Sequence, residues 1–218
     1  MHQADRAGEI ERAYGGGDPR FDIEHHGCVL SAVIDSAAFL EAMANELYQD
    51  AADGHGFTGD GYLAPLGDDT RRRMAQLWRE TAGGQRLRVM ANYRMLLARA
   101  GQEPLDPGAQ PYQDGREVIR LRNTLVHFVP ESMASDEAHA MEKHLRGRFP
   151  DNAFMAGTGN AWWPDFCLGH GCSTWAHMSA VALADQAAQA LGIRPNYQRV
   201  RVDNWKGYER APGESASR

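Results

Sequence analysis

Residues 26–53 read HGCVLSAVIDSAAFLEAMANELYQDAAD, which is the longest helical pattern in the chain. Apolar residues recur in it at alternating spacings of three and four, the periodicity of one face of an α-helix. This face comprises Leu30, Val33, Ala37, Leu40, Ala44 and Leu47. Val29, Ile34 and Phe39 widen the apolar stripe almost all the way round. We therefore predict a long, central and buried helix.

Five further segments carry helical periodicity or the residues that begin and end helices. They span about residues 70–81, 85–100, 114–129, 135–148 and 173–191. We predict an all-α fold, an antiparallel bundle of five or six helices. The residues expected in one shared core are Leu30, Leu40, Leu47, Leu121, Leu125 and Leu183. Residues 149–170 should form an irregular aromatic loop, in which Trp162 and Trp163 plug the bundle because indoles bury large apolar areas.

The helical domain is expected to span residues 23–195. Residues 1–22 contain Gly15-Gly16-Gly17 followed by Asp18-Pro19, which predicts a mobile N-terminal tail. Residues 196–218 are predicted to be a C-terminal extension and tail. The most apolar stretch contains Asp35, Glu41 and Glu46, so we expect no membrane segment.

The chain has a net charge of −6, which by itself gives no sign of nucleic-acid binding. Its three cysteines are too few for a disulfide framework and suggest the cytoplasm. Basic residues are unevenly placed, however. Arginines crowd the segment from Arg71 to Arg99, where Glu80 is the only acid. This run would either follow an RNA backbone through phosphate contacts or form a solvated face balanced by acids elsewhere.

Residues 117–131 read EVIRLRNTLVHFVPE and contain the most informative polar pattern. Arg122 carries a permanent charge on a planar fork that fits a phosphate. His127 can move protons near neutral pH. Together they suit cleavage of RNA without a metal. His127 would take the proton of the 2′-hydroxyl or protonate the leaving 5′-oxygen, and Arg122 would hold the phosphate, leaving a 2′,3′-cyclic phosphate.

Helical geometry restricts how these groups can meet. Arg122 and His127 lie about 140° apart around a helix axis, whereas Arg120, Asn123 and His127 share a face. Two copies of the chain meeting at a two-fold axis would bring Arg122 of one near His127 of the other. In the alternative interpretation, Arg122 pairs with a carboxylate such as Glu41 or Glu46, and His127 merely interacts with the C-terminal end of its helix.

The pattern Arg122-Asn123-x-x-x-His127 resembles the Arg-x4-6-His motif of HEPN domains (higher eukaryote and prokaryote nucleotide-binding). The helices around residues 36–47 and 172–192 also resemble those of small bacterial HEPN-like proteins, so the resemblance covers about residues 25–192. It implies a HEPN-like bundle, a homodimer and often a metal-independent endoribonuclease, in some members within a toxin, defence or stress system with a cognate antitoxin. The alternative is a non-catalytic HEPN-like dimer that binds RNA, a nucleotide or a protein.

On this basis Arg122, Asn123 and His127 are the expected catalytic residues. Arg86, Arg88, Arg94 and Arg120 are the expected RNA-binding residues. No cofactor is expected.

A second cluster of reactive side chains comprises Cys167, His170, Cys172 and His177. These are residue types that bind zinc, but their spacing is not that of a standard zinc finger. Unmodified cysteines also pack like small hydrophobic residues. We therefore expect no metal at this cluster.

Overall fold

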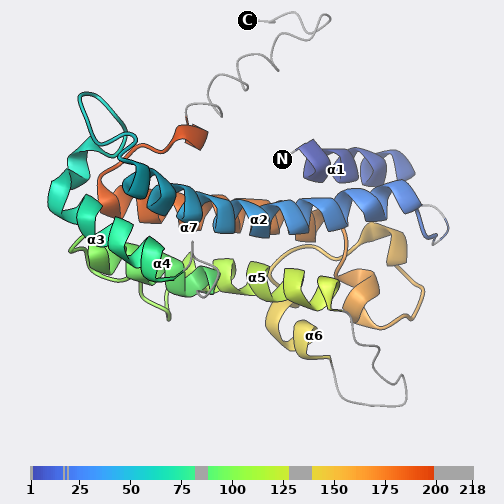
Figure 1. Cartoon of the computed structure of the whole chain (residues 1–218). Coiled ribbons are helices and arrows are strands. Elements are labelled where there is room, and N and C mark those ends of the chain that lie inside the picture. Colours follow the sequence, from blue (N-terminus) through green and yellow to red (C-terminus); the bar gives the residue numbers. More distant parts are fainter. Residues whose placement is uncertain (1, 17, 19, 82–87, 128–138, 199–218) are drawn as a thin grey trace, which may run out of the picture.

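The computed structural model describes residues 2–16, 18, 20–81, 88–127 and 139–198, which contain helices and no strand. The helices are α1 (His2–Tyr14), α2 (Ile23–Asp53), α3 (Gly67–Glu80), α4 (Val89–Arg99), α5 (Tyr112–Val126), α6 (Ala140–Leu145) and α7 (His170–Leu191) (Figure 1). Short helical turns occur at Ala64–Leu66, Ala153–Met155 and Trp162–Phe166. The all-α prediction is confirmed, and the six predicted helices correspond to α2 through α7.

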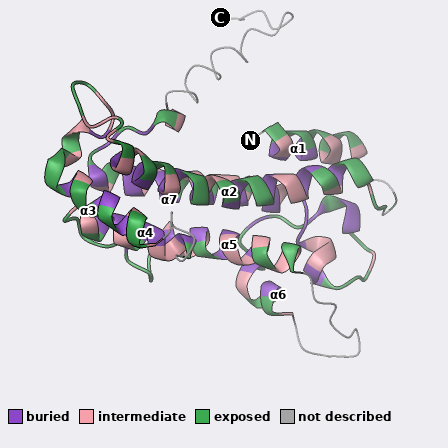
Figure 2. Ribbon diagram, viewed as in Figure 1, coloured by how far each residue is buried: buried purple, intermediate pink, exposed green. Residues whose placement is uncertain are grey.

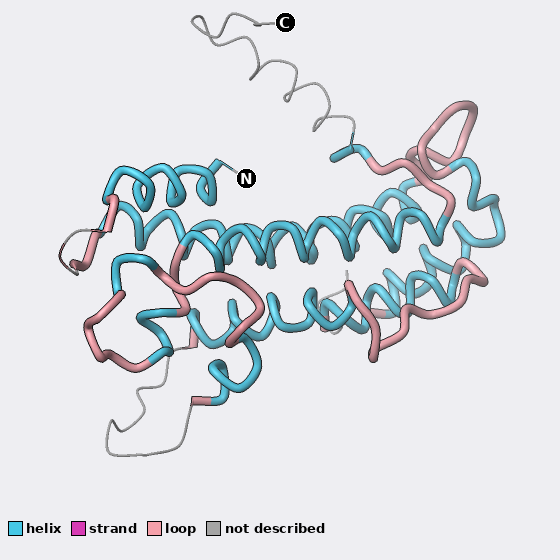
Figure 3. The backbone as a smooth tube through the Cα atoms, turned by 180° about the vertical axis from the view of Figure 1, so that it is seen from behind, coloured by secondary structure: helices cyan, strands magenta, loops and turns pink. Residues whose placement is uncertain are grey.

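Helix α2 runs along the middle of the molecule beside α7, as views from both sides show (Figures 1 and 3). It begins after Asp22, whose side chain accepts a hydrogen bond of 2.9 Å from the His25 amide. It ends at Gly54, whose φ of 75° is a left-handed conformation that glycine adopts without strain. Bands of buried and exposed residues alternate along α2, as expected for a helix with neighbours on several sides (Figure 2).

In the part of the chain that the structure describes, the interior consists of two clusters of buried side chains rather than one core. The first includes Val29, Leu121 and Ala176, from α2, α5 and α7. The second includes Leu47, Tyr112 and Leu191, from the same three helices. Sequence number rises from the first cluster to the second in α2 and α7 but falls in α5. Helices α2 and α7 therefore run in the same direction and α5 runs antiparallel to both, so the expectation of an antiparallel bundle is wrong for the central pair α2 and α7.

The prediction that six leucines share one core is also wrong. Leu40, Leu47 and Leu183 lie in the second cluster, Leu121 lies in the first, and Leu30 and Leu125 pack against the first while only partly buried. Helical periodicity identifies the inward face of each helix. It does not say which end of a long bundle each residue reaches.

Residues 2–14 form α1, which corrects the prediction of a mobile tail over residues 1–22. Ala4 and Ala7 are buried. A Cβ atom at Gly8 would lie 2.7 Å from Cε1 of His170, so the absence of a side chain there lets α1 approach α7 closely. Glu11 Oε1 accepts hydrogen bonds from the His170 amide at 2.7 Å and from Nε2 of His25 at 2.8 Å. An ion pair of 2.6 Å between Arg6 and Glu24 of α2 also ties α1 to the fold. Small and charged residues therefore hold α1 in place, and they produce little apolar periodicity in the sequence.

Within residues 149–170, where an irregular aromatic loop is predicted, the chain forms the helical turns Ala153–Met155 and Trp162–Phe166. Trp162 and Trp163 are both buried, and Nε1 of Trp162 donates to Asp151 Oδ1 at 2.8 Å. Helix α6 is shorter than the predicted segment 135–148, and residues 135–138 lie outside the described part of the chain. Of the predicted C-terminal extension, residues 196–198 are described; Tyr197 donates a hydrogen bond from its hydroxyl to Asp185 Oδ1 at 2.8 Å.

By length and composition, α2 would be able to cross a membrane, although half of its most apolar window is buried by the rest of the fold. A core helix of a soluble protein passes the same test. The acids in this helix therefore do not exclude a membrane segment as firmly as the sequence suggested.

Candidate functional site

Helix α5 positions the residues of the predicted motif. Val118 and Leu121 are buried, and the absence of a side chain at Gly115 allows close contact with Leu183 of α7. The helix ends at Val126, and the amide of His127 donates to the Asn123 carbonyl at 2.9 Å. His127 is thus the residue at which the helix stops, and its side chain is exposed. Residues 128 and 129 of the predicted helix lie outside the described residues.

Arg122 points away from the other motif residues and towards α2. Its Nη2 lies 3.5 Å from Oε2 of Glu41, a carboxylate that is 50% exposed. Its Nε is buried and makes no hydrogen bond. The pairing with Glu41 is the one that the alternative interpretation of Arg122 named.

Arg120, Asn123 and His127 instead line one open cleft of about 650 Å³. We call it the α5 cleft. Its described lining residues are Arg88, Met90, Arg116, Ile119, Arg120, Asn123, Thr124, His127, His139 and Ala140. Three arginines and two histidines are among them, and no carboxylate is. The shared helical face predicted for Arg120, Asn123 and His127 is thus confirmed. The cleft has the charge expected of an anion-binding surface.

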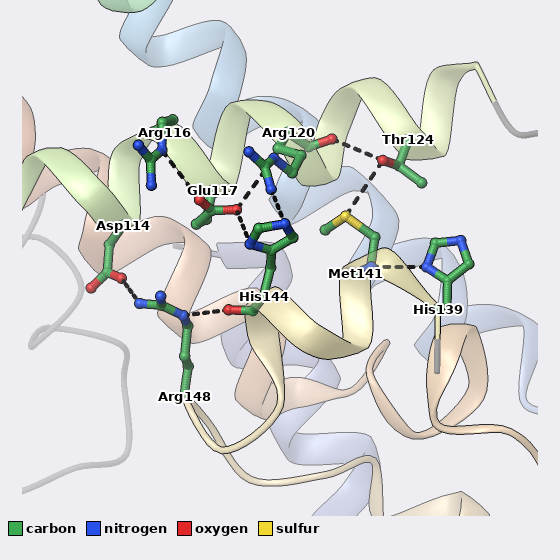
Figure 4. A network of polar contacts seen from close by, with 9 residues as sticks. All are labelled: Asp114, Arg116, Glu117, Arg120, Thr124, His139, Met141, His144 and Arg148. Carbon is green, nitrogen blue, oxygen red and sulfur yellow. Dashed lines mark hydrogen bonds and ion pairs between the residues drawn. The ribbon is translucent and has the colours of Figure 1, made fainter. Parts of the chain in front are cut away.

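A buried carboxylate lies beside the arginines of the cleft (Figure 4). Glu117 is 1% exposed; its Oε1 lies 3.2 Å from Nε of Arg116, and its Oε2 lies 3.5 Å from Nε of Arg120. The side chains of Arg116 and Arg120 nevertheless remain 47% and 39% exposed. Glu117 therefore anchors two guanidinium groups that still reach solvent, which reduces the side-chain entropy lost when they bind an anion.

His144 of α6 completes this network. Its Nε2 contacts Nη1 of Arg120, and its Nδ1 lies 3.8 Å from Oε2 of Glu117 (Figure 4). A guanidinium group can only donate, so Nε2 of His144 accepts and Nδ1 carries the ring proton in this arrangement. Neither Glu117 nor His144 was predicted from the sequence to belong to the site. The spacing of three between Glu117 and Arg120 is a helical ion-pair signal, whereas nothing in the sequence links His144 to them.

The remaining predicted RNA-binding residues do not all lie at the α5 cleft. Arg88 lines the α5 cleft, Arg94 is exposed on α4 without lining it, and Arg86 lies outside the described residues.

The arginines of α3 have partners close by. Arg71 lies 3.7 Å from Asp68, Arg72 pairs with Asp69, and Nε of Arg73 donates to the carbonyl of Arg99 at 2.8 Å. For this part of the arginine run, the interpretation as a solvated face balanced by acids fits the contacts better than an RNA track.

His139 enters the cleft from the start of α6 and was likewise not predicted from the sequence. Its Nδ1 accepts a hydrogen bond of 2.9 Å from the Met141 amide. Its ring stacks on Trp163, with ring centroids 5.2 Å apart and planes 20° from parallel. Only the folded chain brings these two aromatic residues together.

The cysteine and histidine cluster has structural contacts. Cys28, Cys167 and Cys172 are buried and reduced. Burial, followed by a hydrogen bond with the Cys172 thiol, raises the pKa of Cys167, so its thiol stays protonated. Nδ1 of His170 lies 2.9 Å from the Ala4 carbonyl oxygen. Within the described residues, no three His, Cys, Asp or Glu side chains are grouped so that they could hold a metal ion.

Comparison of the chain with protein families, with curated proteins and with solved structures finds no match. The function is therefore inferred from this chain alone, which forms an all-α bundle with an arginine- and histidine-lined cleft beside α5.

Proposed function

We propose that this protein binds RNA in the α5 cleft and cleaves it without a metal ion. The observation that carries the proposal is the grouping of Arg120, Asn123 and His127 with two further arginines in a cleft whose described lining contains no acid. Arginine binds phosphate through paired hydrogen bonds, and a cleft of one charge sign attracts a polyanion.

In the proposed reaction, His127 moves the proton. It takes the proton of the 2′-hydroxyl or gives one to the leaving 5′-oxygen. The 2′-oxygen bonds to phosphorus as the bond to the 5′-oxygen breaks, so the products are a 2′,3′-cyclic phosphate and a 5′-hydroxyl. Arg116 and Arg120 hold the phosphate and the charge that develops on it. Asn123, one helical turn before His127, orients the substrate.

The wider proposal is a cytoplasmic HEPN-like homodimer that acts in a toxin, defence or stress system, with a cognate antitoxin as partner. Its support is the sequence Arg122-Asn123-x-x-x-His127. The ion pair between Arg122 and Glu41 is long, and its Glu41 carboxylate is half exposed. Pairs that reach solvent contribute little stability, about 0–1 kcal/mol. A second copy of the chain or a bound phosphate would therefore displace Glu41 at low cost.

A second candidate is a binding module that does not cleave. The same contact favours it, because Arg122 lies against Glu41 and not in the cleft with His127. This candidate needs only the arginines of the α5 cleft.

Labelled, mixed-sequence RNA incubated with purified protein and EDTA tests the proposal. We expect cleavage by the wild type with cyclic phosphate ends, a loss of about 10²- to 10⁴-fold in His127→Ala, and a loss in Arg120→Ala. Arg146→Ala is the matched control, because this exposed arginine pairs with Glu142 and does not line the cleft. Cleavage that stops in EDTA or persists in His127→Ala contradicts the mechanism. RNA that is bound through Arg120 but stays intact supports the binding module.

A further inference from the structure

Two contacts that differ in kind help to hold the His139 ring in position. The Met141 amide donates to its Nδ1, which places His139 as the cap of α6. The face of the ring lies against Trp163, which is buried and therefore held by the fold. A ring fixed in this way keeps its orientation without a ligand.

His139 also lines the α5 cleft, so part of its surface meets whatever the cleft binds. Met90, Ile119 and Ala140 add apolar lining to the same cleft, beside its arginines. A cleft with both apolar and cationic walls suits a ligand with a flat apolar part and a phosphate. A nucleotide has both.

We infer that His139, backed by Trp163, is a stacking platform for one unpaired nucleobase. The inference rests on the proposed binding of RNA in this cleft and adds how a base, rather than a phosphate, is recognised. Aromatic side chains, histidine included, hold the exposed bases of single-stranded RNA by stacking. Because a paired base has its faces covered by its neighbours, the platform selects single strands over duplexes.

The capping role of His139 is the competing explanation, and two substitutions separate it from stacking. His139→Asn keeps a side-chain acceptor for the Met141 amide but removes the aromatic ring. His139→Phe keeps an aromatic ring on Trp163 but removes the acceptor. Stacking predicts that the phenylalanine variant retains base recognition and that the asparagine variant loses it. Capping predicts instead that the asparagine variant is the more stably folded of the two.

The experiment compares two probes of equal length and charge, a fluorescent single-stranded RNA and the same ribose-phosphate chain without bases. Affinities are measured by anisotropy for the wild type and both variants, with circular dichroism to verify folding. His55→Ala is the matched control, since His55 is an exposed histidine that does not line the cleft. We expect His139→Asn to bind the RNA about 5- to 20-fold more weakly than the wild type. Its affinity for the abasic probe should not change, and His139→Phe should match the wild type on both probes.

The other outcomes separate the failure of this inference from the failure of the proposed function. Equal affinity of the wild type for both probes excludes a base platform while leaving phosphate binding intact. An RNA affinity that falls in His139→Phe but not in His139→Asn assigns His139 to capping alone. Wild-type protein that binds neither probe overturns this inference and the proposed function together. Base-dependent binding through His139 without any cleavage keeps the platform and overturns only the catalytic proposal.

Discussion

The contact between α5 and α7 at Gly115 provides the sharpest test of the packing that positions the cleft. A Cβ atom at residue 115 would lie 2.4 Å from Cδ2 of Leu183 and 3.4 Å from its Cβ. Leu183 is fully buried, so its side chain can yield only by displacing its own neighbours. Gly115→Ala therefore forces either a new rotamer at Leu183 or a shift of α5 away from α7.

Two opposing effects determine how much Gly115→Ala changes the free energy of unfolding. Extra atoms in a packed core cost about 1–3 kcal/mol. Replacing glycine by alanine inside a helix favours folding by about 1 kcal/mol. We expect Gly115→Ala to destabilise the protein by about 0–2 kcal/mol. In a Leu183→Ala background the clashing Cδ2 atom is gone, so the same substitution should stabilise by about 1 kcal/mol.

Gly115→Ala is thus expected to destabilise the wild type but to stabilise the Leu183→Ala variant. Denaturant unfolding of the wild type, both single variants and the double variant measures this difference. Leu183→Ala alone should lose about 2–5 kcal/mol, because it leaves a cavity. A Gly115→Ala variant that is more stable than the wild type, or that has the same effect in both backgrounds, would refute the proposed close contact.

Three further predictions concern other contacts. Arg120→Ala should weaken binding of single-stranded RNA more than Arg94→Ala, because only Arg120 lines the α5 cleft; equal losses in anisotropy titrations would contradict this. Glu11→Ala should cost about 1–3 kcal/mol in denaturant unfolding, since it leaves the buried His25 ring and the His170 amide without their acceptor; unchanged stability would count against α1 as a packed helix. Burial, reinforced by the charge of His25, lowers the pKa of His26, so the unfolded chain binds more protons there and stability falls as the pH drops below about 6.5. Thermal unfolding of His26→Gln should show less of this fall, and an identical pH profile would refute it.

The sequence by itself determined where most helices lie, because helices depend on interactions within a few residues. The spacing of Leu40 and Leu47 in α2, and of Val118 and Leu121 in α5, identified their inward faces without knowledge of the neighbours. Helical geometry likewise placed Arg120, Asn123 and His127 on one face before any tertiary contact was known.

The tertiary structure decided which side chains from distant segments meet. Arg122 faces Glu41 because α2 packs against α5 there, a consequence of how two helices dock and not of the motif itself. The cleft acquires His139 from α6, and Glu117 acquires His144, across segments with no common sequence pattern. Helix α1 is held by the close approach of Gly8 to His170 and by Glu11, so its place depends on the N-terminal end of α7. Local periodicity records which face of a helix is buried, but the partner of that face is set by packing between elements far apart in the chain.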